Sequence, residues 1–165
     1  MKKLKFSFVL TLILLLQIIS SFAYAISPSS DVIYRGIDVS EYQGYINYNS
    51  VKDAGIDIVY IRTSEGTNFI DPYFRENYNN AKAAGLKVGF YHYVTSRSTQ
   101  EAIEEADYFA SVINGTSPDC LLAMDFEYFG GLSNSEVNAI SIAFLQRLEE
   151  VTGKKAIVYS DAYNA

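Results

Sequence analysis

Cysteine, histidine and tryptophan are almost absent from the sequence, which has one cysteine, one histidine and no tryptophan among its 165 residues. A single cysteine excludes an intramolecular disulfide, and one histidine argues against a zinc site, which usually needs several histidine or cysteine ligands. Positive charge is also scarce, because the sequence has 13 lysines and arginines against 19 aspartates and glutamates, which gives a net charge of −6. Binding of nucleic acid through bulk positive charge is therefore excluded.

Apolar and aromatic side chains are abundant instead. Apolar residues make up 49% of the sequence and charged residues 19%, a balance that excludes a disordered chain. The length suits one domain or part of one. Fourteen tyrosines and ten phenylalanines supply flat rings that suit a packed core and also suit the faces of sugar rings.

The first 25 residues have the layout of a secretory signal peptide. Three lysines precede an apolar run over residues 6–19, and Ala23–Tyr24–Ala25 provides a small-x-small cleavage site. The alternative is an uncleaved membrane anchor, although the run is shorter than the roughly 20 apolar residues that a span needs. We therefore expect residues 1–25 to be removed and residues 26–33 to form a short lead-in. The mature protein would be secreted into the extracellular space or cell wall of a bacterium, without stable membrane insertion. Because the protein would do without disulfides, a Gram-positive bacterium is expected.

Predicted strands and helices alternate along the rest of the sequence. Apolar and β-branched runs predict the strands, and apolar residues at helical spacing predict the helices between them. The expected strands cover residues 33–40, 56–63, 86–94, 120–127 and 155–160, and the expected helices cover residues 47–55, 71–84, 99–113 and 133–152. Thr99 is the expected N-cap of the third helix. This alternation predicts an α/β fold with a parallel sheet, and it leaves open a doubly wound domain or an eight-stranded β/α barrel that stops early.

Three carboxylates lie where predicted strands end. Asp38 ends the first strand, and Asp125 and Glu127 end the fourth, two residues apart and so on the same face. The carboxyl ends of parallel strands share one edge of the sheet, where α/β proteins build their sites. At a separation of about 6.6 Å, the charges of Asp125 and Glu127 would repel by roughly 2.5 kcal/mol at an effective dielectric of ~20. That repulsion predicts that one of the two holds a proton near neutral pH, as a general acid must.

Two alternatives to acid–base chemistry stay open at this edge, a Mg²⁺ or Ca²⁺ site and a set of structural ion pairs. Arg62, in the second strand, could neutralise one carboxylate, and Glu65 follows that strand at the same edge. Tyr91 and Tyr93 share one face of the third strand and His92 takes the other, so a tyrosine on the inner face would offer its ring and hydroxyl to a sugar. An acidic run in the third helix is expected to be a solvated face, and it comprises Glu101, Glu104, Glu105 and Asp107.

A set of short motifs appears in an order and at a spacing that resemble those of a known family. The motifs are Gly36–Ile37–Asp38–Val39–Ser40 with Tyr42–Gln43–Gly44, Arg62–Thr63–Ser64–Glu65–Gly66, Asp71–Pro72–Tyr73–Phe74, the run from Gly85 to Tyr93, Met124–Asp125–Phe126–Glu127, and Val158–Tyr159–Ser160. From about Tyr34 to Ala165 the sequence resembles the glycoside hydrolase family 25 lysozymes, the Chalaropsis-type muramidases. The resemblance implies an irregular TIM-like β/α barrel, here C-terminally incomplete after about five β/α units and weakly active by itself.

The resemblance also implies a substrate and roles for the candidate residues. The bond cleaved would be the β-1,4 bond between N-acetylmuramic acid and N-acetylglucosamine in peptidoglycan glycan strands, by a monomer that needs no metal or other cofactor. Glu127 would be the general acid, Asp125 would orient the substrate acetamido group or its oxazolinium ion, and Asp38 would be a further catalytic carboxylate. The residues expected to contact the substrate are Tyr91, Tyr93, Glu65 and Arg62.

Two questions stay open at this point. The carboxylates allow an inverting, a retaining or a substrate-assisted route, of which the resemblance favours the last. A chitinase with a related barrel is disfavoured because Ala123 stands where such enzymes carry a further aspartate. A catalytically inactive peptidoglycan-binding module remains the alternative from a different class.

Overall fold

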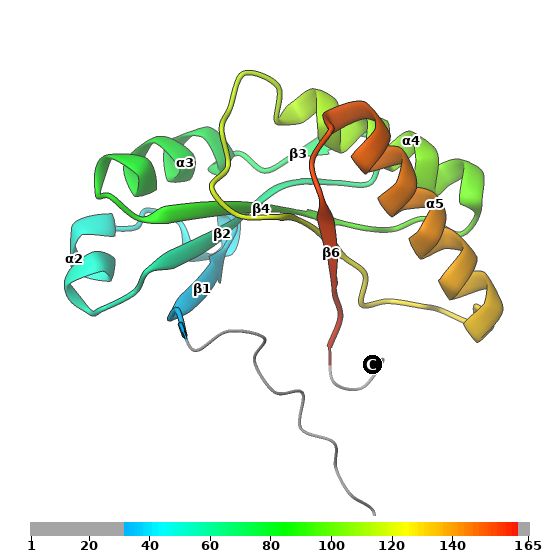
Figure 1. The fold of residues 1–165 in the computed structure, drawn as a ribbon, viewed down its shortest axis with the longest axis horizontal. Coiled ribbons are helices and arrows are strands. Elements are labelled where there is room, and N and C mark those ends of the chain that lie inside the picture. Colours follow the sequence, from blue (N-terminus) through cyan, green and yellow to red (C-terminus); the bar gives the residue numbers. More distant parts are fainter. Residues whose placement is uncertain (1–31, 162–165) are drawn as a thin grey trace, which may run out of the picture. The chain divides into compact units, whose positions relative to one another are not determined.

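The fold is given by a computed structural model, which describes residues 32–161. The predicted signal peptide and residues 26–31 of the lead-in lie outside the described residues. Every helix and strand of the described residues belongs to the compact unit that begins at Tyr34 (Figure 1). The strands are β1 (Gly36–Val39), β2 (Ile58–Glu65), β3 (Phe69–Ile70), β4 (Lys87–Tyr93), β5 (Leu122–Asp125) and β6 (Ala156–Tyr159), and the helices are η1 (Glu41–Gln43, a 3₁₀ turn), α2 (Tyr48–Asp53), α3 (Phe74–Ala83), α4 (Thr99–Val112) and α5 (Asn134–Thr152). Among these residues, no helix combines the length and the hydropathy needed to cross a membrane.

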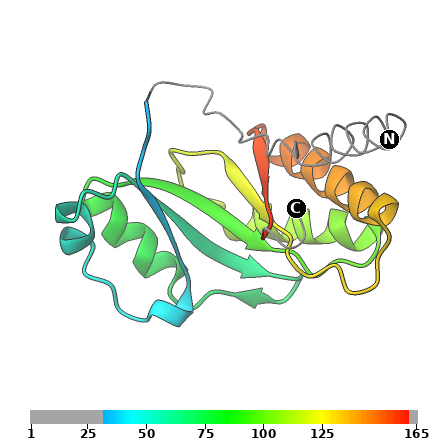
Figure 2. The ribbon, with the colours of Figure 1, turned by 90° about the horizontal axis from the view of Figure 1, so that it is seen from below.

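The strands form one mostly parallel sheet, which confirms the predicted α/β class. Its order is β1-β2-β4-β5-β6, with each neighbouring pair parallel, and β3 adds to β2 in the antiparallel sense. Figure 1 shows α3, α4 and α5 on one side of this sheet, and Figure 2 shows the strands side by side from below. The carboxyl ends of the parallel strands therefore meet at one edge, as a shared site requires.

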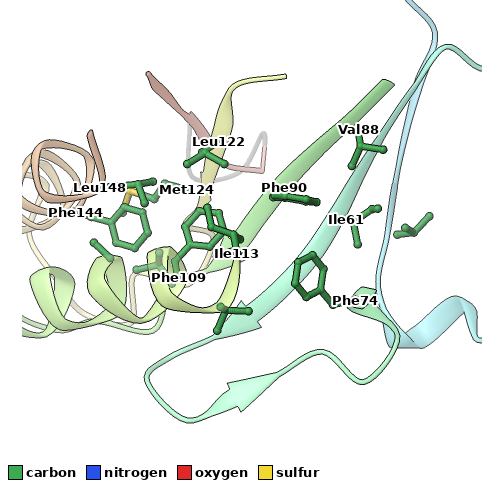
Figure 3. Packing of buried hydrophobic residues seen from close by; sticks show 14 of the residues in the cluster. Ile61, Phe74, Val88, Phe90, Phe109, Ile113, Leu122, Met124, Phe144 and Leu148 are labelled. Atoms are coloured by element: carbon green, nitrogen blue, oxygen red, sulfur yellow. The ribbon is translucent and has the colours of Figure 1, made fainter. Parts of the chain in front are cut away.

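The hydrophobic core lies between the sheet and these three helices. Alternate residues of the central strands face the helices and are buried, namely Val59, Ile61, Val88, Phe90, Leu122 and Met124. Phe74 of α3 meets Phe90 edge-on, with ring centroids 5.2 Å apart (Figure 3). Burial of each such side chain stabilises the fold by roughly 1.5–3 kcal/mol, so this face of the sheet holds the strands in place and leaves the other face for a site.

Several element ends differ from the sequence predictions. The N-cap of α4 is Ser98, whose hydroxyl accepts a hydrogen bond from the backbone of Glu101, and Thr99 is the first helical residue. The helix α3 begins at Phe74, because the carboxylate of Asp71 accepts hydrogen bonds from the backbones of Tyr73 and Glu41 and holds a turn there. The predicted start and end of α5 are confirmed by the capping box at its first turn and by a left-handed glycine after its last.

The prediction that the acidic run of α4 is a solvated face is wrong for Glu105. Glu105 is 3% exposed, and its carboxylate lies 3.2 Å from Nε2 of His92, which is fully buried and packs against the rings of Phe109 and Phe144. Burial lowers the pKa of His92, so the ring is neutral. Burial opposes ionisation of Glu105, but hydrogen bonds from His92 and Thr95 outweigh it and lower the pKa of this carboxyl. A neutral ring that carries its proton on Nε2 satisfies Glu105, while Nδ1 lies 2.8 Å from the hydroxyl of Ser64.

Removal of the Glu105 carboxylate should therefore destabilise the fold strongly. Glu105→Ala leaves the His92 ring and the Thr95 backbone without their acceptor, and we expect a loss of about 2–4 kcal/mol in the free energy of unfolding. Glu104→Ala, at an exposed position one residue away, should change it by less than about 0.5 kcal/mol. Urea denaturation of both variants measures the difference, and equal losses would refute the buried network.

Candidate active site

The face of the sheet that points away from α3, α4 and α5 carries a pocket. Its volume is about 310 Å³. All five parallel strands contribute to it, and the lining is made by Tyr34, Gly36, Ile37, Asp38, Ile58, Tyr60, Tyr91, Ala123, Asp125, Ile157 and Tyr159. Two of the three predicted catalytic carboxylates and one predicted substrate-binding tyrosine thus lie in a single pocket.

The strand register explains how residues distant in sequence come together. Tyr93 of β4 pairs with Asp125 of β5, which pairs in turn with Tyr159 of β6. Asp38 of β1 lies opposite Tyr60 of β2. The charge of Asp38 is close enough to raise the pKa of Asp125, so the two carboxylates interact across the pocket.

Asp125 is the most perturbed carboxyl of the site. It is 8% exposed, and its Oδ1 has no hydrogen-bond partner among the described residues. Burial, followed by the charges of Glu127 and Asp38, raises the pKa of Asp125 to about 7. The sequence predicted a raised pKa from repulsion between Asp125 and Glu127, but burial is the larger cause. An acid with this pKa can hold or release a proton near neutral pH.

Glu127 lies two residues past the end of β5, in the loop that follows the strand. The predicted strand extends to this residue, but regular pairing ends at Asp125, and Phe126 adds a last backbone hydrogen bond to Tyr159 of 3.0 Å. Glu127 is partly buried. Burial and the charges of Asp161 and Asp38 raise its pKa. Glu127 is not among the residues that line the pocket, but it follows the pocket residue Asp125 by two positions, and its charge contributes to the raised pKa of Asp125.

The two predicted tyrosines lie on the pocket side of β4, opposite to His92. Burial and the neighbouring charges of Asp38 and Asp125 raise the pKa of the Tyr91 hydroxyl, although the charge of Arg62 opposes them. For Tyr93 the causes are burial and the charges of Glu127, Asp125 and Glu65. Both hydroxyls are consequently protonated near neutral pH and can donate hydrogen bonds.

Arg62 is buried and pairs with carboxylates, as the sequence suggested, but none of its direct partners is one of the three predicted catalytic carboxylates. Its Nε lies 2.9 Å from Asp71, its Nη2 lies 2.9 Å from Glu41 and its Nη1 lies 3.7 Å from Glu65. The guanidinium therefore pairs with these three carboxylates and acts on Asp125 only as a nearby charge that lowers the pKa. Sequence reasoning missed Asp71 and Glu41, although an aspartate before proline is a common turn signal.

A β-bulge in β2 explains how Glu65 reaches the same side as Arg62. The pairing with β4 shifts between Arg62 and Ser64, so that Ser64 pairs with His92 and Glu65 with Tyr93. Thr63 is the extra residue, and its hydroxyl donates to the backbone oxygen of Tyr91 at 3.2 Å. Strict alternation would put Glu65 among the helices, whereas the bulge turns it toward the site.

Two further pocket tyrosines that lie on strands were missed by sequence reasoning, although strand alternation could have found them. Tyr60 is two residues before Arg62, and Tyr159 follows Ile157 at the same spacing on β6. The ring of Tyr60 lies over Gly89, where a Cβ atom would come within 2.4 Å of it. Within residues 32–161, no three histidine, cysteine, aspartate or glutamate side chains are grouped as a metal site would need.

Comparison with known proteins gives one family. The family model described as glycosyl hydrolases family 25 matches residues 37–163. Lysozyme M1 of Streptomyces globisporus is 36% identical over 146 residues, which cover 83% of this chain and 49% of that protein. The autolytic lysozyme of Clostridium acetobutylicum is 38% identical over 105 residues, which cover 64% of this chain and 32% of that protein.

The structural comparison agrees with the sequence comparison. The crystal structure of the bacterial lysozyme from Streptomyces coelicolor superposes with a TM-score of 0.69 at 36% identity, covering 79% of this chain and 64% of that one. The matched segment spans 32% of the length of the Clostridium lysozyme and 49% of the length of Lysozyme M1.

Proposed function

Because the chain belongs to glycosyl hydrolases family 25, we propose that it is a peptidoglycan hydrolase of the lysozyme, or muramidase, type. The bond cleaved would be the β-1,4 bond between N-acetylmuramic acid and N-acetylglucosamine. The observation that carries the proposal is the buried carboxyl of Asp125, with an unpartnered Oδ1 and a pKa raised to about 7, next to Glu127 and Asp38. Clusters of such carboxyls are what glycoside hydrolysis needs.

Glu127 is the proposed general acid. Its raised pKa favours the protonated form that an acid needs, and its partly exposed side chain, two residues after the pocket residue Asp125, would have access to the glycosidic oxygen. It would donate this proton to the leaving oxygen as the bond to the anomeric carbon breaks. The resulting carboxylate would then take a proton from the water that attacks the intermediate.

Asp125 is proposed to act on the acetamido group of the sugar on the other side of the bond. Its unpartnered Oδ1 can accept a hydrogen bond from the acetamido N–H, which would aim the acetamido oxygen at the anomeric carbon. That oxygen would form the bond to carbon as the leaving group departs, giving an oxazolinium ion whose positive charge the Asp125 carboxylate offsets. Water then opens the ion and regenerates the acetamide.

Asp38 and the polar residues of β2 and β4 are proposed to complete the site. Asp38 would add a second negative charge near the developing positive charge. Tyr91, Tyr93, Glu65 and Arg62 would contact the sugar, with Arg62 held by Asp71 and Glu41.

The wider setting of the domain is also a proposal. We infer that the parallel strands are consecutive β/α units of an irregular barrel, since their order follows the chain from β1 to β6 apart from the short β3. Residues 1–25 would be a signal peptide, residues 26–33 a lead-in and residues 34–165 the family 25 domain. The protein would be a monomer in the cell wall or outside the cell.

Clearing of a purified cell-wall suspension tests the proposal, and EDTA makes the test sharper. Since the carboxylates alone carry the proposed chemistry, we expect the rate at which turbidity falls to be the same with and without EDTA. Loss of clearing in EDTA, with recovery on addition of Mg²⁺ or Ca²⁺, would contradict this and favour a metal-dependent route.

A further inference from the structure

An exposed aromatic ring directly follows the proposed general acid. Tyr128 is 65% exposed, in the loop after β5. The guanidinium carbon of Arg97, in the loop after β4, lies 4.8 Å from the centroid of the Tyr128 ring. Arg97 is itself held, because its Nη1 donates to the backbone oxygen of Phe129 at 2.8 Å. The two loops are thus joined through an arginine that supports the ring.

Gly130 leaves room for this arrangement. A Cβ atom at Gly130 would lie 2.8 Å from Nη2 of Arg97 and 2.9 Å from Cε1 of Tyr128, which is closer than real Cβ contacts allow. The next residue, Gly131, also has a positive φ angle, but a Cβ atom there would have no neighbour within 4 Å. The missing side chain at Gly130 therefore lets the guanidinium and the ring pack against the loop backbone.

The assembly of Arg97, Tyr128 and Gly130 borders the carboxylates of the site. The charge of Arg97 lowers the pKa of Tyr93, whereas Glu127 and Asp125 raise it, so Arg97 and these carboxylates lie near the same hydroxyl. An exposed aromatic residue by itself is ordinary on a protein surface. Here the ring is held by a cation–π contact and a backbone packing site beside the reacting group, which reduces the entropy that a ligand would have to remove.

We propose that Arg97, Tyr128 and Gly130 form a sugar-binding shelf, which stacks a pyranose ring of the peptidoglycan strand next to the bond that is cleaved. This inference rests on the proposed function and adds a subsite to it. The C–H face of a hexopyranose is apolar and flat enough to lie on the tyrosine ring, while its hydroxyl groups stay at the edge, within reach of polar side chains and water.

Retention on insoluble purified peptidoglycan tests the shelf, in a Glu127→Gln background so that binding is measured without hydrolysis. Tyr128→Ala should weaken binding about tenfold, whereas Tyr128→Phe should bind like the parent because stacking needs the ring and not the hydroxyl. Tyr45→Ala is a matched control, since Tyr45 is 77% exposed and lines a different pocket. It should leave binding unchanged.

The glycines give a second test that removes no functional group. Gly130→Ala should weaken binding several-fold, because the new methyl group displaces the ring and the guanidinium, while Gly131→Ala should bind like the parent. Parent-like binding of Tyr128→Ala, or equal weakening by the two glycine variants, would overturn the shelf while the proposed function stands. If the Glu127→Gln parent is not retained on peptidoglycan, the shelf is overturned, and clearing of cell walls by the unsubstituted protein still decides the proposed function.

Discussion

Glu127→Gln is expected to lower the rate of cell-wall hydrolysis at least a hundredfold. Glutamine keeps the size of the side chain but cannot donate the proton that the leaving oxygen needs, and general acid catalysis contributes roughly 10²–10⁴-fold. The side chain is only partly buried, so the midpoint of thermal unfolding should change little. Initial rates of wall clearing, measured beside the melting curve of each variant, give both quantities.

Glu104→Gln is the matched control for this substitution. Glu104 is exposed on α4, and its hydrogen-bond partner Gln100 is a surface residue of the same helix. The control should retain the parent rate. A Glu127→Gln variant with the rate of the parent would remove Glu127 from the chemistry, and the assignment of the acid would then pass to Asp125.

Asp125→Asn is expected to stabilise the protein at neutral pH while it lowers hydrolysis sharply. The pKa of Asp125 is about 7, against an ordinary value of 3.8, so between these values the folded protein binds more protons than the unfolded chain. The free energy of unfolding therefore falls as pH rises from about 4 to about 7. Asparagine removes this loss, and the gain above pH 7 should be as much as about 4 kcal/mol.

The pH dependence separates this explanation from a general effect of the substitution. The gain in stability of Asp125→Asn should be close to zero below pH 4 and grow toward pH 7 in urea denaturation. Asp119→Asn should act in the opposite direction, because burial of Asp119 is outweighed by hydrogen bonds from Lys82 and Val88 that lower the pKa of this carboxyl. A constant gain across the pH range would contradict the buried charge of Asp125.

Local patterns in the sequence predicted the parts of the fold that depend on neighbouring residues. Apolar and β-branched runs identified the five parallel strands, and the capping signals around α5 placed its start and its end. The position of Asp38 and Asp125 at strand ends was enough to predict that they share one edge, because parallel strands bring their carboxyl ends together.

Features that depend on contacts between distant segments could not be predicted in this way. The bulge at Thr63 turns Glu65 toward the site, yet nothing in the local sequence marks an extra residue in the pairing of β2 with β4. Glu105 looks like its exposed neighbours in the sequence, but the position of His92 on the adjacent strand requires it to be buried. The same limit applies to Arg62, whose partners Asp71 and Glu41 become neighbours only after folding.

The identity of the sugar at the newly formed reducing ends of peptidoglycan tests the central proposal most directly. Purified peptidoglycan is incubated with the protein, and the released reducing ends are reduced with borohydride, hydrolysed and identified. Cleavage by the proposed route predicts new reducing ends that are all N-acetylmuramic acid, absent when Glu127→Gln replaces the parent. Retention on the wall without any new reducing end, or new ends at N-acetylglucosamine, would contradict it.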